Sequence, residues 1–241
     1  MSIAEDTRSN VHRFPMMAAP ASGTVSSQTA SSKDEDLKSL HRIESRMHFN
    51  RGETIFNEGD AADYAYKVVS GAVRLCKHLA DGRRQIAQFL FPGDFFSFMD
   101  LKEHSFTAEA VNDVVLLAYP QRQIERLGEE RQGLRKQFAA LLTTRVRDIQ
   151  NHLVMLGRQT AKERVASFLA HVIEHTGVEN GGILELPMTR QDIADYLGLT
   201  IETVCRVLSS MKRKGLVGIP NLHQLIIKDL DALLTIAGGD E

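Results

Sequence analysis

The chain has 241 residues, 43% of them hydrophobic, which is enough for two modest domains with separate cores. Lysine and arginine number 29 against 31 acidic residues, so any basic surface that binds nucleic acid must be local. Two cysteines exclude a disulfide scaffold and fit a reducing cytosol. No apolar run approaches the ~20 residues of a membrane span, and prolines and charges interrupt the apolar pieces near the N-terminus. We therefore expect a soluble, cytoplasmic protein with no membrane partner.

The N-terminal half predicts a short tail followed by a β-rich domain. Residues 1–35 are rich in Ser, Ala, Thr and Pro without a sustained period, which indicates a flexible arm. A short charged helix at 34–43 is expected next. From 47 to 119, short apolar runs alternate with turn signals such as Glu58-Gly59-Asp60 and Asp81-Gly82, a pattern typical of a β-barrel or roll. We assign residues 36–120 to an antiparallel β-roll that resembles a sensor domain.

Residues 121–158 predict a long helix that dimerises. Its apolar residues recur at spacings of four, three, four and three, which is a heptad pattern: Leu142, Val146, Ile149, Leu153 and Leu156. Such a helix can pair with its copy across a two-fold axis. Because the pattern is short, a single amphipathic helix lying on its own domain remains an alternative.

Residues 159–241 predict a winged helix-turn-helix, so the fold class is α+β. An amphipathic helix at 162–175 and a strand at 183–186 precede the stretch 189–208. In that stretch Ala194 is small where two helices would cross, Gly198 lies where the turn needs a positive φ, and Thr189 and Thr200 are suitable N-caps. Apolar runs at 215–217 and 225–227 flank Pro220-Asn221, as expected for a β-hairpin wing.

The second helix of this motif has the periodicity of a DNA-reading helix. The side chains expected to point inward are Ile201, Val204, Val207, Leu208 and Met211. Arg206 would then face outward and can donate two hydrogen bonds to guanine, while Glu202 can accept from cytosine and orient the arginine. Lys212 and its neighbours make the surface locally basic. The residues predicted to contact DNA are Arg190, Thr200, Glu202, Thr203, Cys205, Arg206, Ser209 and Arg213. The alternative is an ordinary exposed Glu/Arg pair.

The segment Glu202-Thr203-Val204-Cys205-Arg206 resembles the E-x-x-S-R motif of the FNR branch of the CRP/FNR regulators. Segments of the expected β-roll match that family's sensor domain as well, including Ser70-Gly71-Ala72-Val73-Arg74-Leu75, Pro92-Gly93-Asp94-Phe95-Phe96 and Ala108-Glu109-Ala110. Within the family the chain is most similar to the FixK branch. The resemblance implies a homodimer that binds double-stranded DNA at palindromes of the TTGA/TCAA kind and recruits RNA polymerase. It implies mainly activation of genes for microaerobic or anaerobic respiration or nitrogen fixation.

The resemblance also bears on cofactors. The family's iron-sulfur sensors need several thiolates, but no cysteine precedes Cys76. Its cyclic AMP receptors use a Gly-Glu pair and an Arg-Ser pair, where this chain has Phe95-Phe96-Ser97-Phe98 and His104-Ser105. We therefore expect no cofactor and a β-roll filled by its own side chains. A cyclic-nucleotide-responsive regulator like CRP is the alternative.

Cys205 replaces the serine of the E-x-x-S-R motif, which predicts a redox-regulatory thiol. Arg206 and Lys212 lie nearby in sequence and favour a thiolate, and an oxidised sulfur acid would repel a polyanion. The alternative is a small residue that replaces serine without chemistry.

A hydrolase is the remaining alternative, because His171, Glu174 and His175 match the H-x-x-E-H pattern of zinc peptidases. The apolar stripe of that helix points elsewhere, so we expect both histidines on a solvated polar flank. We predict no enzyme activity and no metal.

Overall fold

The computed structural model describes residues 40–97 and 102–239. The predicted arm at 1–35 lies outside the described residues. The helix expected at 34–43 lies mostly outside them too, and its described residues 40 and 41 are helical. None of the described helices is both long and apolar enough to cross a membrane.

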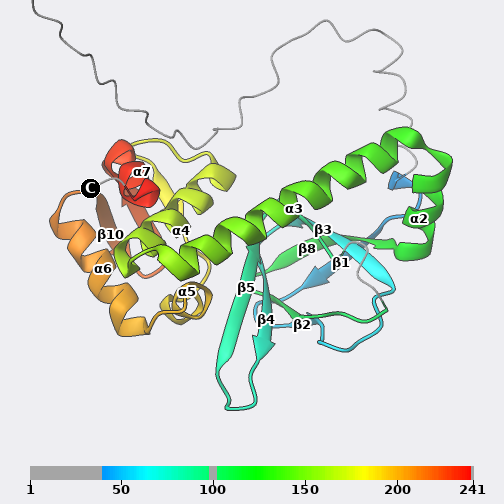
Figure 1. Ribbon diagram of the computed structural model, residues 1–241, viewed down its shortest axis with the longest axis horizontal. Helices are drawn as coiled ribbons and strands as arrows, with labels where there is room; N and C mark the ends of the chain where they lie inside the picture. The colour runs from blue at the N-terminus through cyan, green and yellow to red at the C-terminus, as the bar shows by residue number, and fades with distance from the viewer. Residues whose placement is uncertain (1–39, 98–101, 240–241) are drawn as a thin grey trace, which may run out of the picture.

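The first unit is the expected antiparallel β-roll, built from two four-stranded sheets (Figure 1). One sheet has the order β1-β8-β3-β6 and the other β2-β7-β4-β5. The strands are β1 (Ser45–Phe49), β2 (Thr54–Phe56), β3 (Tyr64–Ser70), β4 (Val73–His78), β5 (Arg84–Leu90), β6 (Phe95–Phe96), β7 (Thr107–Ala110) and β8 (Val114–Pro120). Alternate side chains of both sheets point inward and form the core, in which Phe56, Tyr66 and Phe96 are stacked or tilted against one another.

The long helix expected at 121–158 is two helices, α2 (Gln121–Glu130) and α3 (Gln132–Arg158). The chain leaves the helical conformation at Arg131, where φ is -127° and ψ is 104°. This break lets Leu134 and Phe138 of α3 fold back onto Ile124 of α2 in a small separate core. Burial of these side chains therefore overrides the continuous helical pattern. Helix α3 then runs from the roll to the C-terminal unit (Figure 1).

The C-terminal unit is a winged helix-turn-helix, as predicted. Its elements are α4 (Ala161–Thr176), β9 (Ile183–Glu185), α5 (Arg190–Leu197), α6 (Ile201–Arg213), β10 (Val217–Asn221), β11 (Gln224–Ile227) and α7 (Leu230–Gly238). Thr189 begins α5 with a capping box, and Gly198 ends it in the left-handed conformation at φ 62°. The strands form a small antiparallel sheet in the order β10-β11-β9, which supplies the wing.

The two units share a buried core although they are far apart in sequence. Phe89 of β5 packs against Phe168 of α4 and Tyr196 of α5, with ring centroids 5.9 Å and 5.3 Å away. Ile86 and Phe91 belong to the same buried cluster as the residues that hold α4, α5 and α6 together. Helix α5 therefore lies directly against the β-roll.

Candidate nucleic-acid interface

Helix α6 presents a polar outer face, as its periodicity predicts. Val204, Leu208 and Met211 are buried against the core of the C-terminal unit. The four predicted outward side chains are exposed: Glu202, Arg206, Ser209 and Arg213. Two of the side chains expected to point inward differ, since Ile201 is 36% exposed and Val207 is partly buried. Ile201 is the first residue of α6, and the buried residues of the helix begin at Val204.

Two hydrogen bonds among threonine and arginine residues organise the start of this face. Thr200 is the N-cap of α6, and its hydroxyl accepts from the backbone N–H of Thr203 at 3.3 Å. Arg206 Nη2 donates to the Thr203 hydroxyl at 3.4 Å. Thr203 is therefore the residue that contacts this arginine here, and the orienting role of Glu202 on DNA stays a prediction.

Glu202 is turned toward the beginning of the helix. Its carboxylate accepts from its own backbone N–H and from the Thr200 hydroxyl, and these bonds lower its pKa. The charged form is thus favoured at the positive end of the helix dipole. An ionised carboxylate there can accept hydrogen bonds and cannot donate them.

The C-terminal end of α6 is cationic. Lys212, Arg213 and Lys214 are all exposed, and the first two lie in the last turn of the helix. Positive charge there also complements the negative end of the helix dipole. The unit therefore has a local basic surface on a chain with a net charge of -2.

Arg190 departs from the rest of the predicted DNA-contacting set because it is only 9% exposed. It is the first residue of α5, and its Nη1 atom is buried with no hydrogen-bond partner among the described residues. Burial lowers its pKa, whereas the nearby Cys205 raises it. Arg190 is buried because of the way α5 and α6 cross. The spacing of residues in the sequence does not reveal this crossing.

The two cysteines lie in opposite environments. Cys205 is exposed on α6, beside Arg206. Cys76 is fully buried in β4, and its Sγ lies 3.6 Å from a carboxylate oxygen of Glu109. Burial, together with the charge of Glu109, raises the pKa of the Cys76 thiol to about 12. Cys76 is therefore held as a protonated thiol that donates to the carboxylate.

An apolar strip runs along the outer face of α3. Of the five predicted seam residues, the first four are between 37% and 63% exposed: Leu142, Val146, Ile149 and Leu153. Leu156 instead packs against the buried core of the C-terminal unit. Leu141 and Val154 are also exposed and widen the strip. The heptad pattern missed them because it follows a single line along the helix.

The histidine pair of the H-x-x-E-H pattern packs between α4 and the roll. The ring of Phe91 contacts both His171 and His175. His175 Nδ1 lies 2.9 Å from the carbonyl oxygen of His171, and its Nε2 lies 3.8 Å from Asp94. The expectation of a solvated pair holds for His175, which is exposed, but not fully for His171, which is partly covered by docking against the roll. With both His175 nitrogens facing other groups, the geometry does not form the zinc site of a hydrolase.

A different group, Cys76, His78 and Glu109, is close enough to hold a metal among the described residues. Glu109 is already paired with Arg74 at 2.7 Å. A second cation beside that guanidinium would be repelled, so this group does not fit a metal centre.

Buried side chains occupy the interior of the β-roll beside His104, near where the family resemblance would place a cyclic nucleotide. His104 is buried, stacks on Phe56 with ring centroids 3.5 Å apart, and lies 2.8 Å from the Ser97 hydroxyl through Nδ1. Phe96 is buried among the same rings, whereas Phe98 lies outside the described residues. This arrangement does not favour the alternative of a regulator that responds to cyclic nucleotides.

Comparisons with known proteins agree with both units. Residues 46–131 match the family model described as a cyclic nucleotide-binding domain, and residues 163–236 match the Crp-like helix-turn-helix domain. The nitrogen fixation regulation protein FixK of Rhizobium meliloti (strain 1021) is 40% identical over 188 residues, 78% of this chain and 85% of that protein. The chain belongs to the CRP/FNR family, in its FixK branch.

Further members and a solved structure agree with this assignment. FixK of Bradyrhizobium diazoefficiens is 40% identical over 186 residues, 76% of this chain and 78% of that protein. The structure of FixK2 from Bradyrhizobium japonicum has a TM-score of 0.76 at 35% identity and covers 80% of this chain and 97% of that one. This CRP/FNR protein is a DNA-binding transcription regulator and not an enzyme.

Proposed function

We propose that this regulator binds palindromic DNA of the TTGA/TCAA kind as a homodimer and recruits RNA polymerase, mainly as an activator. The observation that carries the proposal is the exposed polar stripe on α6, the second helix of the helix-turn-helix. Its FixK relatives are named as regulators of nitrogen fixation, which supports a role in genes for nitrogen fixation or for microaerobic or anaerobic respiration. It would act in the cytoplasm, where the DNA is.

Within that interface the side chains have different tasks. Arg206 reads guanine O6 and N7 through two hydrogen bonds, and Glu202 accepts from the N4 amine of cytosine. Phosphate contacts fall to the remaining members of the set, because hydroxyls and cations bind phosphate oxygens. The members with hydroxyls or cations are Arg190, Thr200, Thr203, Ser209 and Arg213. Cys205 lies at the edge of this face, and Lys212, outside the predicted set, also faces the phosphates. Arg190 is 9% exposed and its Nη1 atom is buried, so a phosphate contact from this residue requires its side chain to turn outward.

The apolar strip of α3 is the proposed dimer interface. Exposed leucine, isoleucine and valine side chains on one helix face are removed from water when two copies pair. Two-fold symmetry then presents two α6 helices about one DNA turn apart, ~34 Å, to the two half-sites. The proposed domain organisation is an arm at 1–35, a β-roll at 36–120, a dimerisation segment at 121–158 and a DNA-binding domain at 159–241.

Cys205 is the proposed redox control. It is exposed on α6, so an oxidant in solution reaches its sulfur. Oxidation to a sulfenic or sulfinic acid adds bulk or negative charge beside Arg206, and both oppose contact with phosphates. A disulfide within one DNA-bound dimer is excluded by the distance between the two recognition helices.

The decisive experiment measures the affinity for a TTGA/TCAA palindrome and for a scrambled duplex of equal length at one salt concentration. We expect the palindrome to bind about 1,000-fold or more tightly than the scrambled duplex. Equal affinity for the two duplexes would contradict sequence-specific binding. A footprint on a promoter with RNA polymerase present then tests recruitment.

A further inference from the structure

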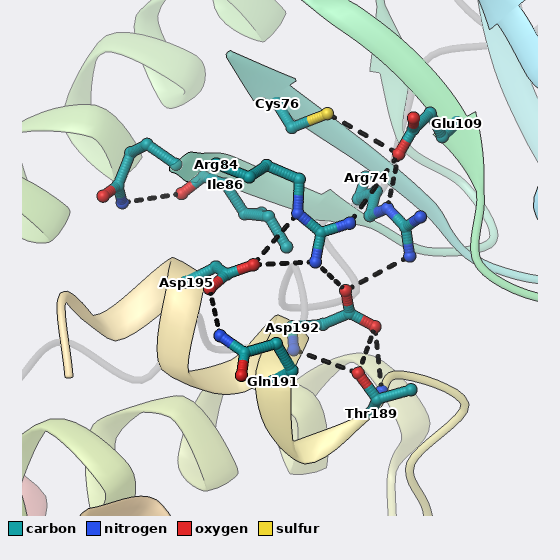
Figure 2. Close-up of polar contacts among 10 residues, drawn as sticks. Arg74, Cys76, Arg84, Ile86, Glu109, Thr189, Gln191, Asp192 and Asp195 are labelled. Carbon is teal, nitrogen blue, oxygen red and sulfur yellow. Dashed lines mark hydrogen bonds and ion pairs between the residues drawn. The ribbon is translucent and has the colours of Figure 1, made fainter. Parts of the chain in front are cut away.

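Five charged side chains form a cluster across the boundary between the β-roll and the helix-turn-helix (Figure 2). Arg84 of β5 donates from Nε and Nη2 to one oxygen of Asp195 in α5, at 3.0 Å and 2.7 Å. The same Nη2 also donates to Asp192 of α5. One arginine of the roll therefore binds two carboxylates on successive turns of the first helix of the DNA-reading motif.

A second guanidinium completes the cluster. Arg74 of β4 donates from Nη1 to the same oxygen of Asp192 at 3.2 Å and from Nε to Glu109 of β7 at 2.7 Å. Two cations thus face three carboxylates, and Asp192 lies between both arginines, as Figure 2 shows. We call these residues the interdomain latch: Arg74, Arg84, Glu109, Asp192 and Asp195.

The latch is shielded from solvent. The side chain of Asp192 is 3% exposed, and those of the other four residues are between 13% and 20% exposed. Screening by salt is weak for such partly buried pairs. If the two units separated, the charges of the latch would have to be hydrated or paired again. The docked position of α5 is therefore favoured over positions in which α5 is only partly separated from the roll.

Asp192 links the latch to the architecture of the DNA-reading motif itself. Its other carboxylate oxygen accepts from the backbone N–H of Thr189 at 2.9 Å and from its hydroxyl at 2.8 Å, which caps α5. Helix α5 packs in turn against α6 through Ala194 and Val204 in the shared core. The orientation of α5 on the roll therefore determines the orientation of α6.

The outer polar face of α6 remains exposed to solvent while the latch is closed. Glu202, Arg206 and Ser209 are exposed while Arg84 holds α5. The latch is thus not a contact that hides α6 from DNA, and it acts on orientation. A dimer that binds two half-sites needs its two α6 helices at one fixed separation. A C-terminal unit that moves relative to the roll loses this freedom of movement on binding DNA, which costs affinity.

We propose that the interdomain latch preorganises the helix-turn-helix for DNA, and that opening the latch weakens binding to the palindrome and relaxes its preference for one half-site spacing. The proposal rests on the dimeric DNA binding proposed above. The docking of α5 on the roll can be followed without DNA, so a failure of the latch is distinguishable from a failure of that function.

The test uses the full chain with Arg84→Ala, Asp195→Ala and the double variant. Asp195 is preferred to Asp192 because it is not part of the capping box. The matched control is Arg83→Ala, since Arg83 pairs with Asp81 in its own hairpin turn and is 78% exposed. Hydrogen exchange of α5 reports docking. Affinity for palindromes with the natural spacing, and with one base pair added or removed, reports preorganisation.

We expect Arg84→Ala to speed exchange in α5 and to lower affinity for the natural spacing about tenfold, with a smaller loss on the altered spacings. Asp195→Ala should weaken binding in the same way, and the double variant should lose less than the product of the two single effects. Arg83→Ala should stay within about twofold of the parent, as is usual for an exposed pair. If Arg84→Ala does not fold, Asp195→Ala carries the test.

Two results would overturn the proposal. One is that the latch variants match Arg83→Ala in both exchange and affinity. The other is that α5 exchanges faster while affinity and spacing preference stay unchanged, because docking would then have no bearing on DNA. If the parent protein shows no preference for the palindrome but the exchange result holds, the fault lies with the proposed function and not with the docking role of the latch.

Discussion

Arg206 Nη2 lies 3.4 Å from the hydroxyl oxygen of Thr203, one turn earlier on α6. The arginine is thus positioned on the outer face of the helix before DNA arrives. A side chain that is already oriented loses less conformational freedom when it binds a base. Because the Thr200 hydroxyl accepts from the backbone N–H of Thr203, the position of Arg206 depends on the way α6 begins.

Loss of Arg206 should reduce both affinity and specificity. We expect Arg206→Ala to cost about 1 to 3 kcal/mol per half-site and to relax discrimination at one guanine, because a bidentate contact to O6 and N7 disappears. Lys212→Ala is the control and should weaken binding to all sequences alike, with a smaller salt slope. Titrations against the palindrome and single-base variants measure both effects. Equal losses for Arg206→Ala on specific and random DNA would rule it out as a base reader.

A charge in the α3 strip should abolish dimerisation. We expect Leu153→Glu to give a monomer in light scattering at micromolar concentration, because a carboxylate would be buried where two copies pair. DNA affinity should fall with it, since one half-site contributes alone. Leu222→Glu is the control, as Leu222 is 70% exposed on the wing and far along the chain from α3. A Leu153→Glu protein that stays dimeric would place the interface elsewhere.

The two cysteines should differ in reactivity. A thiol reagent should modify Cys205 quickly and Cys76 only after unfolding, because Cys76 is buried and its pKa is raised to about 12. Peroxide should weaken DNA binding of the parent, and Cys205→Ser should retain binding. Gel shifts after peroxide treatment, with mass spectrometry of the modified sulfur, measure this. Equal loss of binding in Cys205→Ser and the parent would show that Cys205 is not the switch.

The histidines between α4 and the roll should make stability depend on pH. Burial lowers the pKa of His171 from 6.5 to about 4. The unfolded chain therefore takes up this proton first as the pH falls below 6.5, so the free energy of unfolding decreases between pH 6.5 and 4. At about 1.4 kcal/mol per pKa unit, the loss between pH 6.5 and 4 is on the order of 3 kcal/mol. Urea unfolding at pH 7.5, 6.5 and 5 should show a smaller decrease for His171→Gln than for the parent.

His175 supplies a control, because its pKa is shifted in the opposite direction to that of His171. The interaction with Asp94, 3.8 Å away, raises its pKa, while burial opposes the shift and Glu174 on the same helix adds to it. Its stabilisation is complete below pH 6.5 and is lost as the pH rises through its folded pKa. Asp94 from the roll and Asp148 from α3 also face this junction. His175→Gln should therefore flatten the alkaline side of the profile. A parent profile that is identical to both variants would contradict this account of the junction.

The local elements of this protein follow from its sequence alone. Turn glycines separate the strands of the roll, and at Gly71, where φ is +83°, a Cβ would approach the Asp113 carbonyl oxygen to 2.3 Å. Thr189 and Thr200 begin the two helices of the reading motif, and Gly198 turns between them. Such signals act within a few residues of chain, so they are visible without a structure. They were sufficient to predict the β-roll, the winged helix-turn-helix and the outward stripe of α6.

Only the tertiary structure decided how these elements meet. The break at Arg131 and the burial of Arg190 depend on how neighbouring helices pack, and the covering of His171 depends on Phe91 of the distant roll. The latch between Arg84 and Asp195 joins residues separated by 111 positions, and nothing in the spacing around either one reports the other. The pairing arises because apolar residues such as Phe89 and Tyr196 bury their rings together and bring the charged groups beside them into range. Burial of apolar surface does not depend on how far apart two residues lie in the sequence. The partners of these charges were therefore not predictable from the sequence.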